Sequence, residues 1–134
     1  MGAVNYDRDR PVTLVFVYGS LKQGFGNHYL LKNSRYLGAC ETVSRHKMIS
    51  LGAFPGVIWT GGENTIKGEV YDVLNENDRI ALDNLEGYPN FYSKERIWTT
   101  YGPAYMYVLS KNFLANGNYD DYPAIEHGEW KHAS

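Results

Sequence analysis

The sequence predicts an α+β domain in which many short strands curl into a barrel beside two short helices. Its 12 Tyr and 14 Gly, together with frequent Val, Ile and Thr, are typical of strands and turns rather than long helices. Short apolar runs recur between turn residues, whereas only two segments have a helical pattern. Hydrophobic residues make up 43% of the 134 positions, which is enough for one packed core.

The first expected strand covers residues 12–18, a compact apolar and β-branched run that ends at Gly19. Such a run indicates a strand buried on both faces. Further strands are expected at 35–43, 46–51, 57–60 and 65–74, with a turn at 52–56. Residues 92–101 and 104–110 are expected to form a hairpin across Gly102 and Pro103. The proline is placed at the turn because it has no N–H to donate within a central strand.

Two segments are predicted to be helical. Residues 24–32 are a short candidate that follows a glycine-rich loop. Residues 77–86 are the stronger candidate, because their apolar side chains share one face and Asn75 or Asn77 can cap the start. Gly87 can adopt the left-handed conformation that ends a helix, and Pro89 lies just beyond it.

The whole chain, residues 1–134, is expected to be a single domain. Within it we expect a flexible N-terminal extension at 1–11, a barrel core at 12–110 and a C-terminal tail at 111–134. The tail mixes polar and aromatic residues without a period, so it is expected to be loop with Trp130 docked on the domain.

Composition and charge argue against several classes of function. The formal charge is -2, with 13 basic and 15 acidic residues interspersed, so neither a nucleic acid nor a membrane is expected as a partner. The single cysteine, Cys40, allows no internal disulfide, and the four histidines lack ligand spacing, so no metal site is expected. The chain contains no apolar run long enough for a membrane span, and its start is polar, which favours a cytoplasmic location.

The first candidate site is the glycine-rich loop from Tyr18 to Gly26, between the first strand and the first expected helix. Such a loop exposes backbone N–H groups that can hold an anion. Phe25 stands where a P-loop requires Lys, and Tyr29 stands where a dinucleotide fingerprint requires its third Gly. The loop therefore suits a smaller anion such as a carboxylate, and the alternative is a flexible strand-to-helix turn.

The second candidate is Glu86, in the last turn of the helix expected at 77–86. The helix macrodipole disfavours a carboxylate there, and burial would raise its pKa further, toward the range useful for proton transfer. A surface glutamate near a helix end is the alternative. Asp83 lies one turn earlier, and Lys94 and Arg96 follow as candidate ion partners.

In their order along the chain, these segments resemble the γ-glutamylcyclotransferase superfamily, in particular its avirulence-induced-gene-like, or γ-glutamylamine cyclotransferase-like, branch. The resemblance covers about residues 12–109. It is carried by Tyr18-Gly19-Ser20-Leu21-Lys22-Gln23-Gly24, Phe54-Pro55-Gly56, Ile66-Lys67-Gly68-Glu69-Val70-Tyr71-Asp72-Val73, Leu82-Asp83-Asn84-Leu85-Glu86-Gly87 and Phe91-Tyr92. At one position the family commonly has Arg and this chain has Lys94, which cannot form the bidentate fork of an arginine.

The resemblance implies a small mixed β-barrel of about six strands with two or three short helices and a cavity at one mouth. It implies an enzyme of the acyltransferase or lyase type that needs no cofactor and converts a small-molecule γ-glutamyl substrate to 5-oxoproline. Glu86 would be the catalytic general base and acid. Substrate-binding residues would be Tyr18, Gly19, Ser20, Leu21 and Tyr92.

Two alternatives to this activity use the same site. One is a hydrolase or lyase that acts on a larger glutamyl conjugate. The other is a module that binds a small ligand or a partner without catalysis, for which a carboxyl group at Glu86 would have no purpose. The sequence leaves the oligomeric state open.

Overall fold

The first strand, β1 (Leu14–Val17), lies at the centre of a five-stranded sheet. The computed structural model describes residues 12–117 and 119–131. The other strands of this sheet are β2 (Arg35–Glu41), β5 (Lys67–Asp72), β6 (Tyr92–Thr99) and β7 (Gly102–Leu109). They are ordered β2-β5-β1-β7-β6, and β1 pairs antiparallel with β5 and parallel with β7, so the sheet is mixed.

A second sheet has three strands in the order β4-β3-β8. They are β3 (Lys47–Ser50), β4 (Pro55–Ile58) and β8 (Ala124–Ile125). The sheets meet closely, since a Cβ added at Gly56 in β4 would lie 2.7 Å from a methyl carbon of Leu109 in β7. The predicted α+β class is confirmed, and closure of the strands into one barrel stays a prediction.

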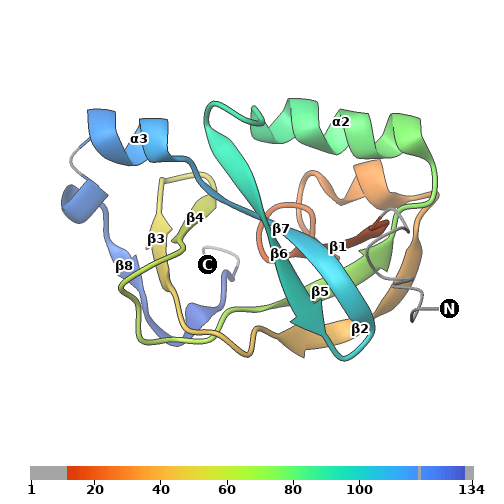
Figure 1. Cartoon of the computed structure of the whole chain (residues 1–134), viewed down its shortest axis with the longest axis horizontal. Helices are drawn as coiled ribbons and strands as arrows, with labels where there is room; N and C mark the ends of the chain where they lie inside the picture. The colour runs from red at the N-terminus through yellow and green to blue at the C-terminus, as the bar shows by residue number, and fades with distance from the viewer. Residues whose placement is uncertain (1–11, 118, 132–134) are drawn as a thin grey trace, which may run out of the picture.

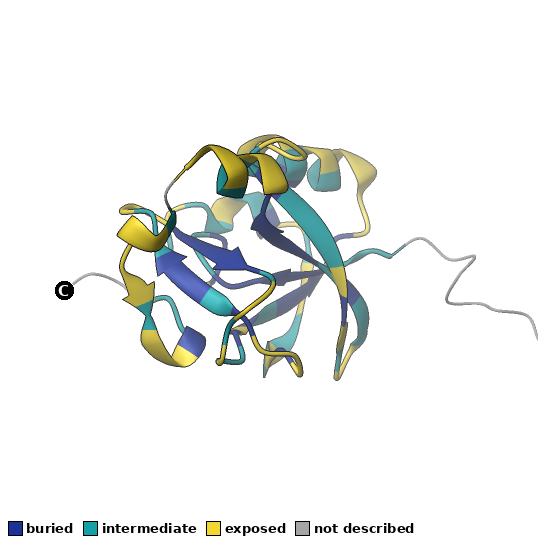
Figure 2. Cartoon of the chain, turned by 60° about the vertical axis from the view of Figure 1, so that its left-hand side comes forward, coloured by how far each residue is buried: buried dark blue, intermediate teal, exposed yellow. Residues whose placement is uncertain are grey.

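Two α-helices, α2 (Glu76–Glu86) and α3 (Lys111–Asn116), lie along the same side of the molecule (Figure 1). Their outward faces are exposed, and the strands beneath them are largely buried (Figure 2). The described residues also form three short 3₁₀ helices, η1 (His28–Leu31), η2 (Tyr119–Asp121) and η3 (Glu126–Gly128). No helix among the described residues has the length and apolar character needed to cross a membrane.

The predicted end of the main helix at Glu86 is confirmed, and of the two candidate caps it is Asn75 that precedes the helix, which starts one residue before the predicted position 77. The Asn75 side chain accepts hydrogen bonds from the backbone N–H groups of Asn77, at 2.8 Å, and Asp78, at 3.3 Å. Gly87 takes a φ of 65°, and its N–H donates to Asn84 O. The chain therefore leaves the helix immediately after Glu86, which fixes where that side chain can point.

The helix predicted at 24–32 is reduced to the single 3₁₀ turn η1. Asn27, which precedes η1, makes no side-chain cap on it, and its amide nitrogen donates to the Ser20 hydroxyl at 2.8 Å. Without a cap and with only four helical residues, the segment does not continue as an α-helix.

The tail predicted as loop at 111–134 contains α3 and β8. Ser110 caps α3 by accepting from the Phe113 N–H at 3.1 Å, and β8 adds to the edge of β3. These elements were missed because both are too short to show a period. Trp130 packs against the core, as predicted. The extension predicted at 1–11 lies outside the described residues.

Two strands begin earlier than predicted, each with a proline at or near its start. Pro55 opens β4, two residues before the predicted start at Val57, and Pro103 is the second residue of β7, paired with Trp98, rather than part of the hairpin turn. The parallel pairing of β1 with β7 begins only at Ala104, so Pro103 has β6 as its single strand neighbour, at the edge of the sheet where proline is tolerated.

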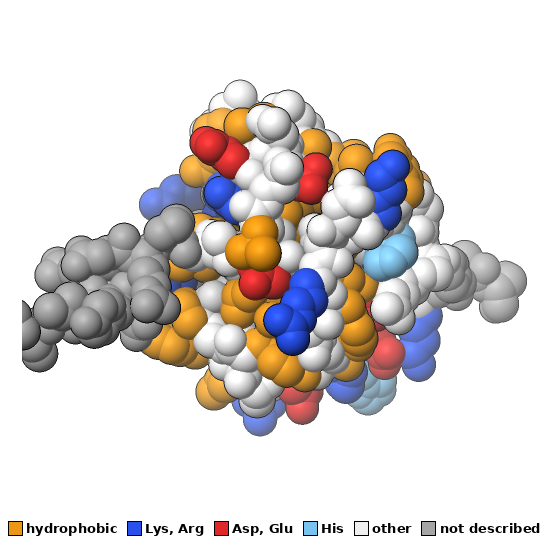
Figure 3. All heavy atoms as spheres, turned by 90° about the vertical axis from the view of Figure 1, so that its right-hand side faces the viewer, with side chains coloured by type: hydrophobic (Ala, Val, Ile, Leu, Met, Phe, Trp, Pro, Cys, Tyr) orange, Lys and Arg blue, Asp and Glu red, His pale blue; other side chains and the backbone are white. Residues whose placement is uncertain are grey.

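The central strand separates two clusters of core side chains. Val15 and Val17 belong to one cluster, and Phe16 belongs to the other, as expected for a strand buried on both faces. On the outer face seen in Figure 3, basic and acidic side chains are interspersed with apolar ones, as their distribution along the sequence predicts.

Candidate active site

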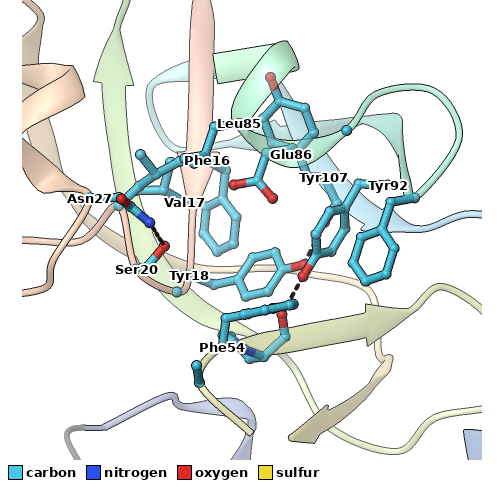
Figure 4. Close-up of a pocket in the computed structure, with 16 residues that line it drawn as sticks. Phe16, Val17, Tyr18, Ser20, Asn27, Phe54, Leu85, Glu86, Tyr92 and Tyr107 are labelled. Carbon is cyan, nitrogen blue, oxygen red and sulfur yellow. Dashed lines mark hydrogen bonds between the residues drawn. The ribbon is translucent and has the colours of Figure 1, made fainter. Parts of the chain in front are cut away.

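A cavity of about 500 Å³ opens where the end of β1, the end of α2 and the start of β4 come together (Figure 4). Its walls are mainly apolar and aromatic. They are formed by Phe16, Val17, Tyr18, Gly19, Ser20, Leu21, Asn27, Ala53, Phe54, Pro55, Leu85, Glu86, Gly87, Phe91, Tyr92 and Tyr107. All six residues singled out from the sequence therefore lie around one cavity, although their roles there stay predictions.

The loop after β1 is folded so that its backbone donors remain available. The Lys22 N–H donates to Gly19 O at 3.0 Å, and the Asn27 N–H donates to Ser20 O at 2.9 Å. Within the described residues, the N–H groups of Gly19, Ser20 and Leu21 have no acceptor. Because these three residues line the cavity, their N–H groups are free to meet a ligand there, and the predicted binding of an anion by the loop stays a prediction.

Gly19 is required by close packing. A Cβ at this position would lie 2.9 Å from two ring carbons of Pro55, which real Cβ contacts essentially never approach. The loop and the start of β4 therefore pack directly against each other at the cavity wall. Gly19 therefore has a steric role, separate from the predicted role of the loop in binding an anion.

Glu86 is the last residue of α2, and its carboxylate projects into the cavity (Figure 4). Burial among apolar side chains raises the pKa of this carboxyl from 4.5 to about 7. A carboxyl group with such a pKa can both accept and return a proton near neutral pH. The structure agrees with the expectation that burial raises the pKa of the Glu86 carboxyl.

Three buried tyrosines support the cavity wall. The Tyr18 hydroxyl donates to Tyr107 O at 2.7 Å, and the Tyr92 hydroxyl donates to Pro55 O at 2.6 Å. Burial, with a smaller contribution from the charge of Glu86, raises the pKa of Tyr18 and Tyr92. Both therefore remain neutral hydrogen-bonding groups and link β1, β4, β6 and β7 around the cavity.

Tyr107 was not predicted from the sequence. Its hydroxyl donates to Asp83 Oδ1 at 2.5 Å, which ties β7 to α2 one turn before Glu86. Burial and then the bond to Asp83 raise the pKa of Tyr107. Alternation in β7 could have placed Tyr107 on an inner face, but nothing in the sequence indicates that it meets Asp83.

Lys94 lies against the helix rather than on the cavity wall. Its Nζ is 3.2 Å from Asp83 Oδ1, and it also lies 4.3 Å from the ring centre of Tyr88. The sequence offered Lys94 as an ion partner for this region, and the structure assigns it to Asp83. Among the described residues, no group of three or more His, Cys, Asp or Glu could hold a metal ion.

Tyr107→Phe is expected to lower the free energy of unfolding by about 1–2 kcal/mol, because Asp83 loses a charge-assisted hydrogen bond but keeps Lys94. Urea denaturation measures this difference. Tyr105→Phe is the matched control. The Tyr105 ring keeps its contact with Lys94 in this variant, and the Tyr105 hydroxyl makes no hydrogen bond within the described residues. Equal destabilisation of both variants would contradict the assigned role of the bond.

Comparison with known proteins gives consistent matches. Residues 15–132 match the family described as "Gamma-glutamyl cyclotransferase, AIG2-like", and this range includes every residue of the cavity wall. The Escherichia coli "Gamma-glutamylcyclotransferase family protein YtfP" is 35% identical over 117 residues, which cover 87% of this chain and 94% of that protein.

Solved structures of related proteins have the same fold as this chain. The solution structure of ytfP from Escherichia coli has a TM-score of 0.65 and 34% identity, and covers 87% of this chain and 95% of that chain. The crystal structure of an AIG2-like protein from Mus musculus has a TM-score of 0.74, covering 91% of this chain and 90% of that one. At 21% identity, the mouse protein supports the fold alone.

Proposed function

Because the chain belongs to the AIG2-like gamma-glutamyl cyclotransferase family, we propose that it cyclises the γ-glutamyl group of a γ-glutamyl amine or amino acid. The products are 5-oxoproline and the free amine. One observation supports this proposal above the others. A half-buried carboxyl group with a pKa of about 7 shares a cavity with a loop of unpaired backbone N–H groups. The expected closure of the strands into a small barrel, with this cavity at its mouth, belongs to the same proposal.

In this proposal the substrate lies across the cavity from the loop to α2. The N–H groups of Gly19, Ser20 and Leu21 hold its α-carboxylate. The α-amine faces Glu86, and the γ-carbonyl carbon curls back within reach of the amine. The nucleophile is already part of the substrate, so the cavity accelerates the reaction largely by selecting the curled conformer.

The reaction needs no oxidant, water or other co-reactant. A bond forms between the α-nitrogen and the γ-carbonyl carbon, and the bond from that carbon to the leaving nitrogen breaks. The α-ammonium group loses two protons, and the leaving nitrogen gains two. Glu86 carries these protons, acting first as a base and then as an acid.

The proposal is tested by incubating the protein with γ-glutamyl amines and γ-glutamyl amino acids and measuring 5-oxoproline by mass spectrometry. Release of 5-oxoproline is the expected result. Release of glutamate would indicate a hydrolase instead. If thermal stability rises with a γ-glutamyl compound while no product forms, the protein is a binding module and the proposed activity is wrong.

Gly19→Ala is expected to raise KM roughly 10-fold to 100-fold, because the added methyl group would push the loop away from Pro55 and misalign its N–H groups. Steady-state kinetics measures the change. Gly26→Ala is the matched control in the same loop, since its Cβ would meet no atom within 4 Å. A Gly19→Ala enzyme with the KM of Gly26→Ala would count against the loop as the carboxylate site.

A further inference from the structure

The glycine-rich loop contains a lysine that does not face the cavity. Lys22 directly follows Leu21, yet only Leu21 lines the cavity. Lys22 lines a second hollow of about 380 Å³, which shares no lining residue with the cavity. A lysine next to a loop proposed to bind a carboxylate is a natural candidate for direct contact with that carboxylate. Its place in the second hollow argues against such a contact here.

The side chain of Lys22 is held by the C-terminal tail. Its Nζ donates to Trp130 O at 2.7 Å, although the two residues are 108 positions apart in the sequence. Lys22 is only 8% exposed, which is unusual for a lysine and costs free energy unless the amine meets an acceptor. Trp130 in turn packs against the core cluster that contains Tyr18. The tail therefore presents this carbonyl from a packed position.

The anchored residue closes the turn that carries the available N–H groups. The Lys22 N–H donates to Gly19 O at 3.0 Å. This bond closes a turn with Ser20 and Leu21 at its centre. The start of the turn packs against β4, since a Cβ on Gly19 would collide with Pro55. The end of the turn is tied to the tail through Lys22, so distant parts of the chain hold the turn at both ends.

We propose that Lys22 is a positioning residue for the carboxylate site, and that it acts by tying the turn to the carbonyl of Trp130. The inference rests on the proposed function, because the N–H groups of this turn are those proposed to hold the α-carboxylate of the substrate. Hydrogen bonds depend steeply on distance and angle, so a small displacement of the turn weakens several of them together. The tail thereby contributes to the site without lining the cavity.

Lys22→Met tests the inference, with Lys67→Met as its matched control. Lys67 lines the same second hollow, and its Nζ also donates to a tail carbonyl, that of His127, at 2.8 Å. It lies on β5 rather than in the loop. Lys22→Met is expected to raise KM for a γ-glutamyl substrate about tenfold and to change kcat far less, because the lost carboxylate binding is shared by the ground state and the transition state. Lys67→Met should leave both constants unchanged.

Steady-state kinetics of 5-oxoproline release measures these constants, and circular dichroism checks that each variant is folded. Equal KM values for Lys22→Met and Lys67→Met, or an effect of Lys22→Met on kcat alone, would overturn the inference and leave the proposed function intact. Release of no 5-oxoproline by the unmodified protein from any γ-glutamyl compound would instead overturn the proposed function, and this inference with it.

Lys22→Arg separates the hydrogen bond from the rest of the side chain. Arginine restores an N–H donor at this position, and the second hollow has space for its larger head group, so KM should return close to that of the unmodified protein. A Lys22→Arg enzyme with a KM as high as that of Lys22→Met would contradict the role assigned to the bond.

Trp130→Ala tests the same link from the side of the tail, whether or not Lys22→Met folds. It removes the packing that places the carbonyl, so KM is again expected to rise about tenfold. Because both residues act through one link, the KM of the double variant should be no higher than that of either single variant. If the two effects multiply, or if Trp130→Ala leaves KM unchanged, Lys22 does not act through the tail and the inference is wrong.

Discussion

Glu86→Gln is expected to reduce the rate of 5-oxoproline release by about 10²- to 10⁴-fold while leaving the fold intact. Glutamine preserves the size of the side chain but cannot accept the proton of the α-amine. The loop of Gly19 to Leu21 is unaffected, so KM should change far less than kcat. Steady-state kinetics with a γ-glutamyl substrate measures both constants.

The control for this variant is Glu76→Gln. Glu76 is exposed in the first turn of the same helix, so the same chemical change occurs on α2 but outside the cavity. Its kcat should equal that of the unmodified protein. A Glu86→Gln enzyme that kept about a tenth of the activity would show that Glu86 is not the general base.

Local signals in the sequence were sufficient for most of the elements that build the site. The apolar run that becomes β1, the asparagine cap of α2 and the glycine stop after Glu86 all act through neighbouring residues. Elements that depend on distant pairing were harder to predict. β8 has two residues and exists because β3 presents an open edge to it.

The site was predictable where its residues belong to segments in a recognisable order. A glycine-rich loop and a carboxyl group at a helix end each have an ordinary structural explanation, and it was the order of these segments along the chain, which resembles that of the family, that singled out Gly19 and Glu86. Tyr107 could not be singled out, because one of 12 tyrosines gives no sign of its partner. The ring contact between Phe91 and Phe113 likewise forms only when α3 folds beside Phe91.

A second large effect is expected in the dependence of stability on pH. Burial raises the pKa of the Glu86 carboxyl from 4.5 to about 7 in the folded protein. Below pH 4.5 this group is protonated in both the folded and the unfolded state, and its ionisation has no effect on stability. As the pH rises from 4.5 to about 7, the carboxyl ionises in the unfolded chain while it stays protonated in the folded protein, so the folded state loses stability. Above about pH 7 the carboxyl is ionised in both states and no further stability is lost.

Glu86→Gln removes this ionisation and should therefore be more stable than the unmodified protein at pH 8, by on the order of 2 kcal/mol, and similar to it at pH 4.5. Urea denaturation of both proteins at a series of pH values measures the difference, in which the titration of all other groups cancels. Glu76→Gln should show a difference that does not vary with pH, because that side chain is exposed. A Glu86→Gln advantage that is constant with pH, or largest at pH 4.5, would mean that the carboxyl is not held protonated by the cavity. The residue proposed to carry the chemistry would then be an ordinary surface acid.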